Sequence, residues 1–161
     1  MSPSTADLVD AHGDRLKICQ VQFRHFSRAL RFHGPIRTVK TIEDNALIKQ
    51  ALSSAGRGSV LVIDGAASLR SALVGDVIAG LAERNGWAGL VVYGAIRDTA
   101  LLAALNLGIK ALGSNPRKSA KVGIGQVDVP VNFGGIDFRT GEWLYSDEDG
   151  IVVSEQPLSG S

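Results

Sequence analysis

Two aspartates and one arginine in the middle of the chain have the types and spacing of residues that handle an oxygen-rich anionic substrate. Arg97 and Asp98 follow the short apolar run Leu90–Tyr93, and twenty residues separate Asp76 from Arg97. The guanidinium of Arg97 is always charged and suits a carboxylate or an enolate oxygen. Asp98 is a hard oxygen ligand suited to Mg²⁺ or Mn²⁺, and Mg²⁺ lets water and substrate complete its coordination. A 2-oxo acid chelates such an ion, so these residues predict carbon–carbon bond cleavage through an enolate.

The backbone around Asp76 adds a place for an anion. Gly75, Asp76, Val77 and Ile78 lie where a helical pattern opens. The first N–H groups of a helix have no partner within it, and they attract a carboxylate. Two simpler interpretations stay open, in which Asp76 is only a helix cap and the arginine–aspartate pair is only a surface ion pair or a cap.

The elements that must position these residues alternate between strands and helices. Short continuous apolar runs predict strands buried on both faces, and amphipathic runs between them predict helices. This order favours parallel pairing with right-handed crossovers, and ligands bind beyond the carboxyl ends of such strands. We therefore expect Asp76 and Arg97 to face one crevice. The expected strands are Ser59–Asp64, Leu90–Tyr93 and Ile109–Leu112, and the expected helices are Asp76–Arg84 and Asp98–Leu105.

The flanking segments give the fold a mixed character. A helix over Thr5–His12, capped by Ser4 or Thr5, precedes the region, and the last third is rich in glycine turns and β-forming residues. We predict antiparallel strands there, and hence a parallel α/β core with β additions. The remaining expected elements are a strand over Ile36–Val39, a helix over Asn45–Leu52 capped by Asp44, strands over Gly123–Val131 and Phe133–Phe138 around Gly134–Gly135, and a strand over Ile151–Ser154.

The composition bounds the class of protein. The chain has 161 residues, 45% of them apolar, with 17 basic and 16 acidic side chains. This balance excludes a nucleic-acid binder that works by bulk charge, and the apolar content excludes a disordered chain. The single cysteine, Cys19, forms no internal disulfide, and no apolar run approaches the ~18–20 residues of a membrane span. We expect one cytoplasmic domain over residues 1–161 with loose ends at 1–4 and 157–161, and a solvated face for the basic patch of Arg117, Lys118 and Lys121.

Long stretches of the chain resemble a known family. From Thr5 to about Glu155 the sequence is similar to the family shared by regulators of ribonuclease activity, type A, and class II 4-hydroxy-4-methyl-2-oxoglutarate aldolases. The resemblance implies a compact mixed-sheet α/β/β sandwich of the swivelling-domain kind, assembled as a ring-shaped homotrimer with active sites between subunits. The matching stretches are TADLVD (5–10), EDNALIK (43–49), GSVLVIDGAASLRSALVGD (58–76), NGWAGLVVYGAIRD (85–98), LGIKALGSNPRKS (107–119), VNFGGIDF (131–138) and YSDEDGIVVSE (145–155).

The resemblance also implies roles for the residues singled out above. The backbone at Gly75, Asp76, Val77 and Ile78 would bind the pyruvate part of the substrate, and Arg97 would bind its carboxylate or keto oxygen and stabilise the enolate. Asp98 would hold the divalent metal cation, Mg²⁺ or Mn²⁺, partly through water. Asp76 would position a water for proton transfer. The implied reaction is retro-aldol cleavage of 4-hydroxy-4-methyl-2-oxoglutarate to two pyruvates, with oxaloacetate decarboxylation as a side activity.

The chain differs from many aldolases of the family in two respects, and two other functions are ascribed to similar sequences. Many aldolases of the family carry an acid three positions after the arginine–aspartate pair, where this chain has Leu101, and the longer ones have a C-terminal extension beyond the position of Ser161. Some members only inhibit ribonuclease E-type enzymes by binding them, and these tend to lack the aspartate that this chain keeps as Asp98. Similar sequences also carry the name of a menaquinone methyltransferase, but this chain lacks the glycine-rich loop after its first strand that such a fold uses.

Overall fold

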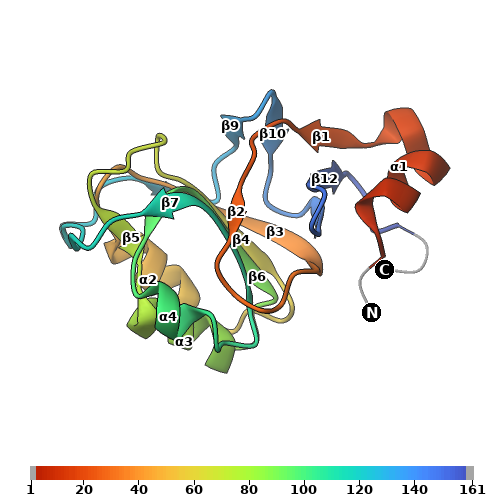
Figure 1. Cartoon of the computed structure of the whole chain (residues 1–161). Helices are drawn as coiled ribbons and strands as arrows, with labels where there is room; N and C mark the ends of the chain where they lie inside the picture. Colours follow the sequence, from red (N-terminus) through yellow and green to blue (C-terminus); the bar gives the residue numbers. More distant parts are fainter. Residues whose placement is uncertain (1–2, 159–161) are drawn as a thin grey trace.

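A computed structural model describes residues 3–158 and places a mixed β-sheet at the centre of the molecule (Figure 1). Four parallel strands form its middle in the order β3-β4-β6-β7, and β5 pairs with the far end of β6. The parallel pairing predicted from the alternation of strands and helices is confirmed. These strands are β3 (Phe32–Lys40), β4 (Val60–Asp64), β5 (Ala72–Val74), β6 (Gly89–Ile96) and β7 (Gly108–Ser114).

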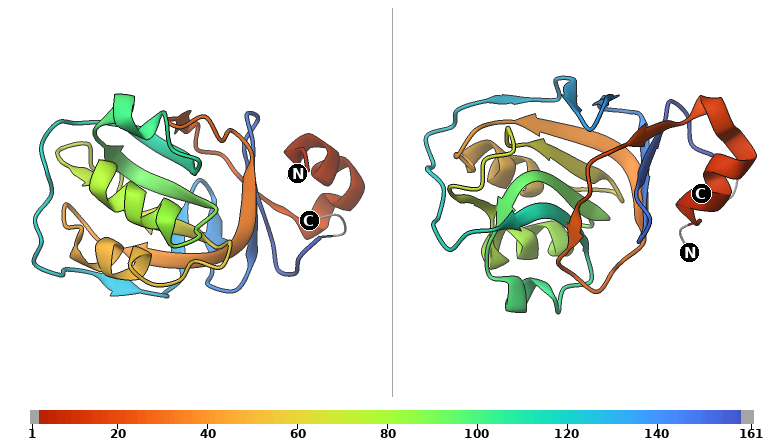
Figure 2. Two further views of the ribbon diagram at one scale, coloured as in Figure 1. Left: turned by 90° about the horizontal axis from the view of Figure 1, so that it is seen from below. Right: turned by 45° about the horizontal axis from the view of Figure 1, so that its top comes forward.

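Helices α2 (Ala46–Leu52), α3 (Asp76–Arg84) and α4 (Thr99–Leu102) cover one face of the sheet (Figure 2). The apolar runs are continuous because β4 and β6 are covered on both faces: alternate residues such as Leu61 and Ile63 pack toward the helices, while Val60 and Val62 pack the opposite way. Within the described residues no helix is long and apolar enough to cross a membrane.

A second β layer covers the other face. The hairpin of β9 (Val131–Phe133) and β10 (Ile136–Phe138) turns at Gly134 and Gly135, whose positive φ angles of 63° and 82° favour glycine. Phe133 of the hairpin stacks on Tyr93 of β6 with ring centroids 4.5 Å apart. The sheet continues through antiparallel strands on the same side, so the expected α/β/β sandwich is confirmed. These strands are β1 (Lys17–Cys19), β11 (Trp143–Ser146) and β12 (Ile151–Ser154), and β2 (Arg24–His25) pairs with β7 at the opposite edge.

Two expected elements differ in extent. The strand predicted over Gly123–Val131 reduces to β8 (Gln126–Val127), because Gly123 and Gly125 have φ angles of 100° and 125° that interrupt extended pairing. The helix predicted over Asp98–Leu105 is only α4, because Asp98 takes a left-handed conformation and the turn after Leu102 tightens. Another expected element differs in kind: the stretch Phe133–Phe138, predicted as one strand, contains the turn at Gly134 and Gly135 that separates β9 from β10. Predicted bounds elsewhere agree within a few residues, whereas β1, β2, β5 and β11 are too short to show a sequence period.

Both flanks of the described chain are anchored to the sheet. Ser4 caps α1 (Thr5–His12) by accepting from the Asp7 N–H, and a 3₁₀ turn (Gly13–Arg15) follows. Thr5 donates through its N–H and its hydroxyl to buried Asp147, both at 2.7 Å. Leu158 donates its N–H to the Tyr145 hydroxyl. Residues expected in loose ends are thus held at both flanks, while 1–2 and 159–161 lie outside the described residues.

One lysine is buried where β7 meets the turn between β11 and β12. Lys110 is 3% exposed, and its Nζ donates to the carbonyls of Asp147 and Gly150 at 2.7 and 3.1 Å. Burial lowers the pKa of Lys110 to about 8, although the Asp147 carboxylate opposes the shift. The native fold therefore holds an ammonium whose charge it disfavours.

This lysine should make the protein more stable in mild alkali. Between about pH 8 and the ordinary lysine pKa of 10.5, the native state has released the Lys110 proton while the unfolded chain still holds it. The free energy of unfolding then rises with pH, by roughly 3 kcal/mol across the window. Urea unfolding at intervals from pH 7 to 10.5 measures the rise, and Lys110→Met should lack it. An equal slope in both proteins would contradict the assignment.

Candidate functional site

The residues singled out in the sequence meet where β5 and β6 end. Gly75 and Asp76 follow β5, and Arg97 and Asp98 follow β6. Two hydrogen bonds join these segments: the Arg97 N–H donates to the Val74 carbonyl at 2.9 Å, and the Asp76 N–H donates to Asp98 Oδ2 at 3.0 Å. The expectation that both segments face one crevice at the carboxyl edge of the sheet agrees with this geometry.

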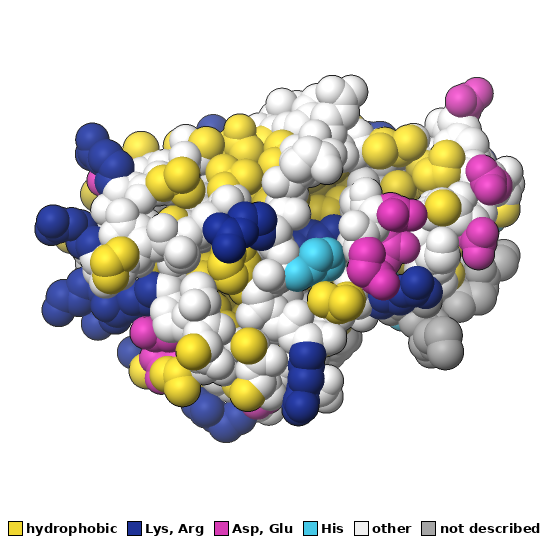
Figure 3. All heavy atoms as spheres, in the orientation of Figure 1, with side chains coloured by type: hydrophobic (Ala, Val, Ile, Leu, Met, Phe, Trp, Pro, Cys, Tyr) yellow, Lys and Arg dark blue, Asp and Glu magenta, His cyan; other side chains and the backbone are white. Residues whose placement is uncertain are grey.

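The crevice is a cavity of about 140 Å³. The five residues predicted to bind or act on substrate all line it. Asp98 is not among the lining residues, but its carboxylate lies next to Gly75, since a Cβ on Gly75 would stand 2.7 Å from Asp98 Oδ2. Lys and Arg side chains gather at this end of the molecule, at the left of Figure 3. The lining residues are Asn45, Lys49, Ala72, Gly75, Asp76, Val77, Ile78, Arg97, Lys118 and Lys121.

The opening of α3 supplies backbone donors to the cavity. Gly75 occupies the N-cap position of α3 and has no side chain to cap the helix. Asp76 is therefore the first residue of α3 rather than its N-cap. The Asp98 carboxylate takes over the capping role by accepting the Asp76 N–H. The N–H groups of Val77 and Ile78 lie in the first turn, where no helical carbonyl can accept from them. They remain available for an anion at the positive end of the helix dipole.

Asp98 is held in an uncommon conformation as a carboxylate. Its φ and ψ of 61° and 41° are left-handed, a region that aspartate tolerates better than most residues. The pKa of Asp98 is lowered, chiefly because the Asp76 N–H donates to it, with the side chains of Asp76 and Arg97 acting in the same direction against burial. Backbone strain of this kind collects at functional sites, and here it turns the carboxylate back toward α3.

Arg97 is half-buried at the wall of the cavity. Its Nη1 donates to the Pro116 carbonyl at a long 3.4 Å, which leaves most of its five N–H donors for a ligand. Among residues 3–158 no ion pair joins Arg97 to Asp98. The interpretation of the two as a surface ion pair therefore finds no support in the geometry.

The donor set fits a divalent cation that keeps its water. The described residues contain no cluster of three or more His, Cys, Asp or Glu side chains that could enclose a metal. Asp98 offers carboxylate oxygens, one of them already accepting from the Asp76 N–H, and the Asp76 side chain is exposed beside it. Mg²⁺ and Mn²⁺ accept one or two carboxylates with water and substrate, whereas a structural zinc site needs four protein ligands. Asp98 could thus hold Mg²⁺ or Mn²⁺.

Close packing at Gly75 gives a test of this geometry. In Gly75→Ala the new Cβ would stand 2.7 Å from Asp98 Oδ2 and 3.3 Å from two atoms of Arg97, so both side chains must shift. We expect the free energy of unfolding to fall by about 1–3 kcal/mol, the usual effect of overpacking. Gly80→Ala on the same helix meets only the flexible tip of Arg84 and should stabilise by roughly 0.5–1 kcal/mol. Urea unfolding of both variants measures the contrast, and equal effects would contradict it.

Three lysines of the cavity were not among the predicted site residues. Lys118 and Lys121 were expected on a solvated face, and Lys49 belongs to a matched stretch without a distinguishing spacing. The signal that could have found them was the sequence from Asn115 to Lys121, which follows a parallel strand and so lies at the ligand-binding edge. Glu43, which begins the same matched stretch as Lys49, does not line the cavity and binds Arg70 at 3.0 Å.

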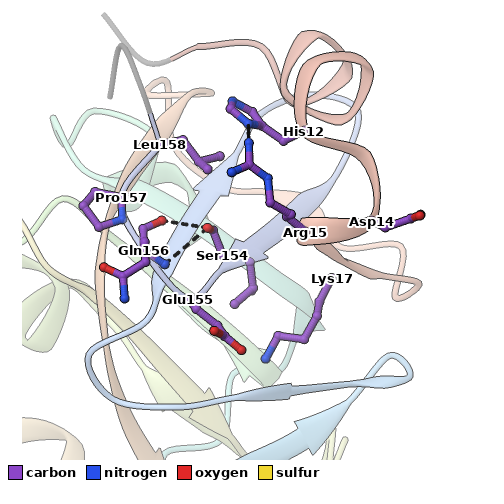
Figure 4. Close-up of a pocket in the computed structure, with 10 residues that line it drawn as sticks. His12, Asp14, Arg15, Lys17, Ser154, Glu155, Gln156, Pro157 and Leu158 are labelled. Carbon is purple, nitrogen blue, oxygen red and sulfur yellow. Dashed lines mark hydrogen bonds between the residues drawn. The ribbon is translucent and has the colours of Figure 1, made fainter.

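A second hollow, of about 480 Å³, lies near α1 (Figure 4). The stretch from His12 to Lys17 and the stretch from Val153 to Leu158 line it, with charges of both signs. Arg15 donates toward the His12 ring, and Lys17 binds Glu142 at 2.9 Å. None of the predicted site residues lines this hollow, so the chemistry expected from the sequence belongs to the cavity at α3.

Comparisons with known proteins agree on one family. A family model described as RraA-like, Aldolase/RraA, matches residues 5–153. A protein of Alkalilimnicola ehrlichii, provisionally named 4-hydroxy-4-methyl-2-oxoglutarate aldolase, is 53% identical over 158 residues. The alignment covers 98% of this chain and 98% of that protein.

Solved structures share the fold over nearly the whole chain but have different names. A protein of Geobacillus kaustophilus, titled S-adenosylmethionine:2-dimethylmenaquinone methyltransferase, is 42% identical with a TM-score of 0.97, and 99% of each chain is covered. The RNA-processing inhibitor RraA of Thermus thermophilus is also 42% identical, with a TM-score of 0.95 and coverage of 99% of this chain and 97% of that one.

Proposed function

This chain belongs to the Aldolase/RraA family, and we propose that it is a divalent-metal-dependent lyase that cleaves 4-hydroxy-4-methyl-2-oxoglutarate and related 4-carboxy-2-oxo acids to pyruvate. One observation carries the proposal: Arg97 and the free N–H groups of the α3 opening line one cavity, and the Asp98 carboxylate lies next to Gly75 of that lining and accepts from the Asp76 N–H. The aldolase name of the 53% identical relative supports a lyase.

The cavity residues can take the substrate through the reaction as follows. The N–H groups of Val77 and Ile78 receive the carboxylate at carbon 1, and Arg97 binds the keto oxygen at carbon 2. A water positioned by Asp76 takes the proton from the hydroxyl at carbon 4, which lets the bond between carbons 3 and 4 break. Its electron pair becomes the enolate of one pyruvate, and the hydroxyl-bearing carbon becomes the keto carbon of the other. Asp76, exposed at the rim, positions a water that returns a proton to carbon 3.

Electrostatic stabilisation is the main task of the site. The negative charge of the enolate develops on the oxygen beside Arg97, where a half-buried guanidinium stabilises it more than it would in bulk water. Asp98 would hold Mg²⁺ or Mn²⁺, which acts as a Lewis acid and supplies further positive charge when bound. Decarboxylation of oxaloacetate yields the same enolate, with carbon dioxide as the other product, so we propose it as a secondary activity of the same residues.

We propose a homotrimer with the site near a subunit interface, as the family resemblance leads us to expect. Support comes from exposed apolar side chains in the segment that follows Lys121 of the site: Val122 is 77% exposed, and Ile124 and Val127 are each about one-half exposed. Ile42, also half exposed, lines a separate hollow together with Ile124. A cluster of exposed apolar side chains of this kind is typical of a surface that binds another protein. Sedimentation equilibrium distinguishes a trimer from a 16.9 kDa monomer.

A coupled assay tests the lyase. Pyruvate release from 4-hydroxy-4-methyl-2-oxoglutarate and from oxaloacetate is followed through lactate dehydrogenase, with Mg²⁺, with Mn²⁺ and with EDTA. We expect turnover with either ion above the rate of the ion alone, and its loss in EDTA. No pyruvate above that background would exclude the proposal and favour a second function.

That second function is a protein that binds ribonuclease E-type enzymes and inhibits them. It is favoured by the TM-score of 0.95 to the RNA-processing inhibitor. The methyltransferase name of the Geobacillus kaustophilus protein finds less support in the local geometry. The first parallel strand, β3, leads through Thr41–Asn45 into α2 with no glycine, whereas nucleotide-type cofactor loops depend on glycines at that turn.

A further inference from the structure

We propose that Lys49, Lys118 and Lys121 bind the second carboxylate of the substrate and so select 2-oxo acids that carry one. The proposal rests on the proposed function, because it assumes that the 2-oxo carboxylate end lies against Arg97 and α3. All three lysines line the same cavity of about 140 Å³ as those groups.

The charges of the cavity exceed what a monocarboxylate can balance. Of its lining side chains, Arg97 and the three lysines are cationic, and Asp76 alone is anionic. Within residues 3–158 none of these lysines forms an ion pair. Like charges gathered without counter-ions raise the local positive potential and attract an anion of matching charge. A pyruvate-sized ligand at Arg97 leaves the lysines uncompensated, whereas a dicarboxylate reaches both groups.

The backbone that carries Lys118 and Lys121 is fixed in place. The Ala72 N–H donates to the Arg117 carbonyl at 2.7 Å, which places Lys118 beside Ala72 of β5. Ala72 lies two residues before the end of that strand. The buried Ser119 hydroxyl donates to the Ala72 carbonyl at 2.7 Å. These bonds hold the first half of the segment against the strand that leads into the Gly75 turn.

The second half of the segment is tied to the start of α2. Buried Asp44 accepts from the N–H groups of Val122 and Gly123 at 2.7 and 3.1 Å, and the Asn45 N–H donates to the Ala120 carbonyl. Lys49 lies one helical turn beyond Asn45. The lysines therefore project from a preorganised frame, which reduces the conformational entropy lost when a ligand binds.

The lysines suit the far end of the substrate better than the reacting end. A lysine ammonium is a compact charge on a flexible stem, and it binds a carboxylate without fixing its geometry tightly. The rigid fork of Arg97 and the helix N–H groups suit the reacting end, where orientation decides the rate. In this arrangement α3 and Arg97 orient the reacting end of the substrate, and the lysines select substrates that carry a second carboxylate.

Two unreactive ligands of equal length test the assignment. 2-Oxoglutarate and 2-oxopentanoate share the 2-oxo acid end and differ in having a carboxylate or a methyl group at carbon 5, and neither carries the hydroxyl needed for cleavage. Isothermal titration calorimetry with Mg²⁺ present should show 2-oxoglutarate binding to the wild type at least about tenfold more tightly, with the preference falling as salt rises. The Lys118→Met/Lys121→Met protein should lose that preference and keep its affinity for 2-oxopentanoate.

The control variant is Lys40→Met, which removes an exposed lysine that does not line this cavity. It should bind both ligands as the wild type does. Equal affinities in the wild type, no binding of either ligand, or an equal loss for both ligands in the double variant would each overturn the assignment. A clear preference for 2-oxoglutarate without pyruvate release from 4-hydroxy-4-methyl-2-oxoglutarate would support the lysine site and overturn the lyase instead.

Discussion

Replacing Arg97 by alanine is expected to lower kcat/KM for pyruvate release by about 10²- to 10³-fold, the effect of removing one preorganised donor to an oxyanion. The reason is the place of the guanidinium, which lines the cavity together with the α3 opening and has most of its donors unengaged. Coupled kinetics with oxaloacetate and with 4-hydroxy-4-methyl-2-oxoglutarate should show similar losses, because both reactions form the same enolate.

Arg117→Ala provides the matched control. Arg117 is an exposed arginine of the neighbouring loop that does not line the cavity, and its hydrogen bond to Ala72 uses the backbone carbonyl, which alanine keeps. Its kinetics should stay within about twofold of the wild type, as for most surface substitutions. Arg97→Ala activity comparable to that of Arg117→Ala would remove the guanidinium from the mechanism.

Replacing Asp98 by asparagine is expected to weaken binding of Mg²⁺ or Mn²⁺ and to lower pyruvate release by at least about 100-fold, since metal Lewis acidity supplies several kcal/mol. Asparagine tolerates the left-handed conformation of Asp98, and its amide oxygen can still accept the Asp76 N–H. The substitution therefore removes the charge while it preserves the turn. Calorimetric titration with Mn²⁺ measures the change in Kd directly, and the coupled assay measures the rate.

Asp128→Asn is the control for that substitution. Asp128 is also an aspartate with positive φ, 56°, but it is exposed and binds Arg37 at 2.8 Å away from the cavity. It should leave metal affinity and turnover unchanged. Wild-type Mn²⁺ affinity in Asp98→Asn would mean that the cation, if bound, is held by other residues.

The parts of the fold that the sequence reveals are those buried on both faces or amphipathic over several turns. The continuous run in β4 and the 3.6-residue pattern of α3 each carry a period long enough to identify, and their alternation predicts the parallel sheet. Strands of two to four residues such as β2, β5 and β11 carry no such period. Their pairing is decided by neighbours distant in the sequence, as where Ala72 of β5 lies between β6 and Lys118.

The site was predictable in its residue types but only partly in its geometry. Strand order brings Asp76 near Arg97, and the parallel topology follows from the sequence. The left-handed turn at Asp98 was not predictable, because aspartate adopts it only where surrounding contacts hold it there. The meeting of Lys49 with Lys118 and Lys121 was not predictable either, since it depends on the hydrogen bonds of Asp44 and Ser119 to segments far along the chain.

The contacts of the N-terminal flank determine when it can fold during synthesis of the chain. Thr5 finds its acceptor in Asp147, and β1 pairs with β12, so the first twenty or so residues gain their native partners only after residue 154 has been made. While the ribosome adds the intervening chain at about 5–20 residues per second, the α1 segment must wait several seconds in solution. Docking of α1 is thus a late event of folding, and chaperones have that interval in which to bind it.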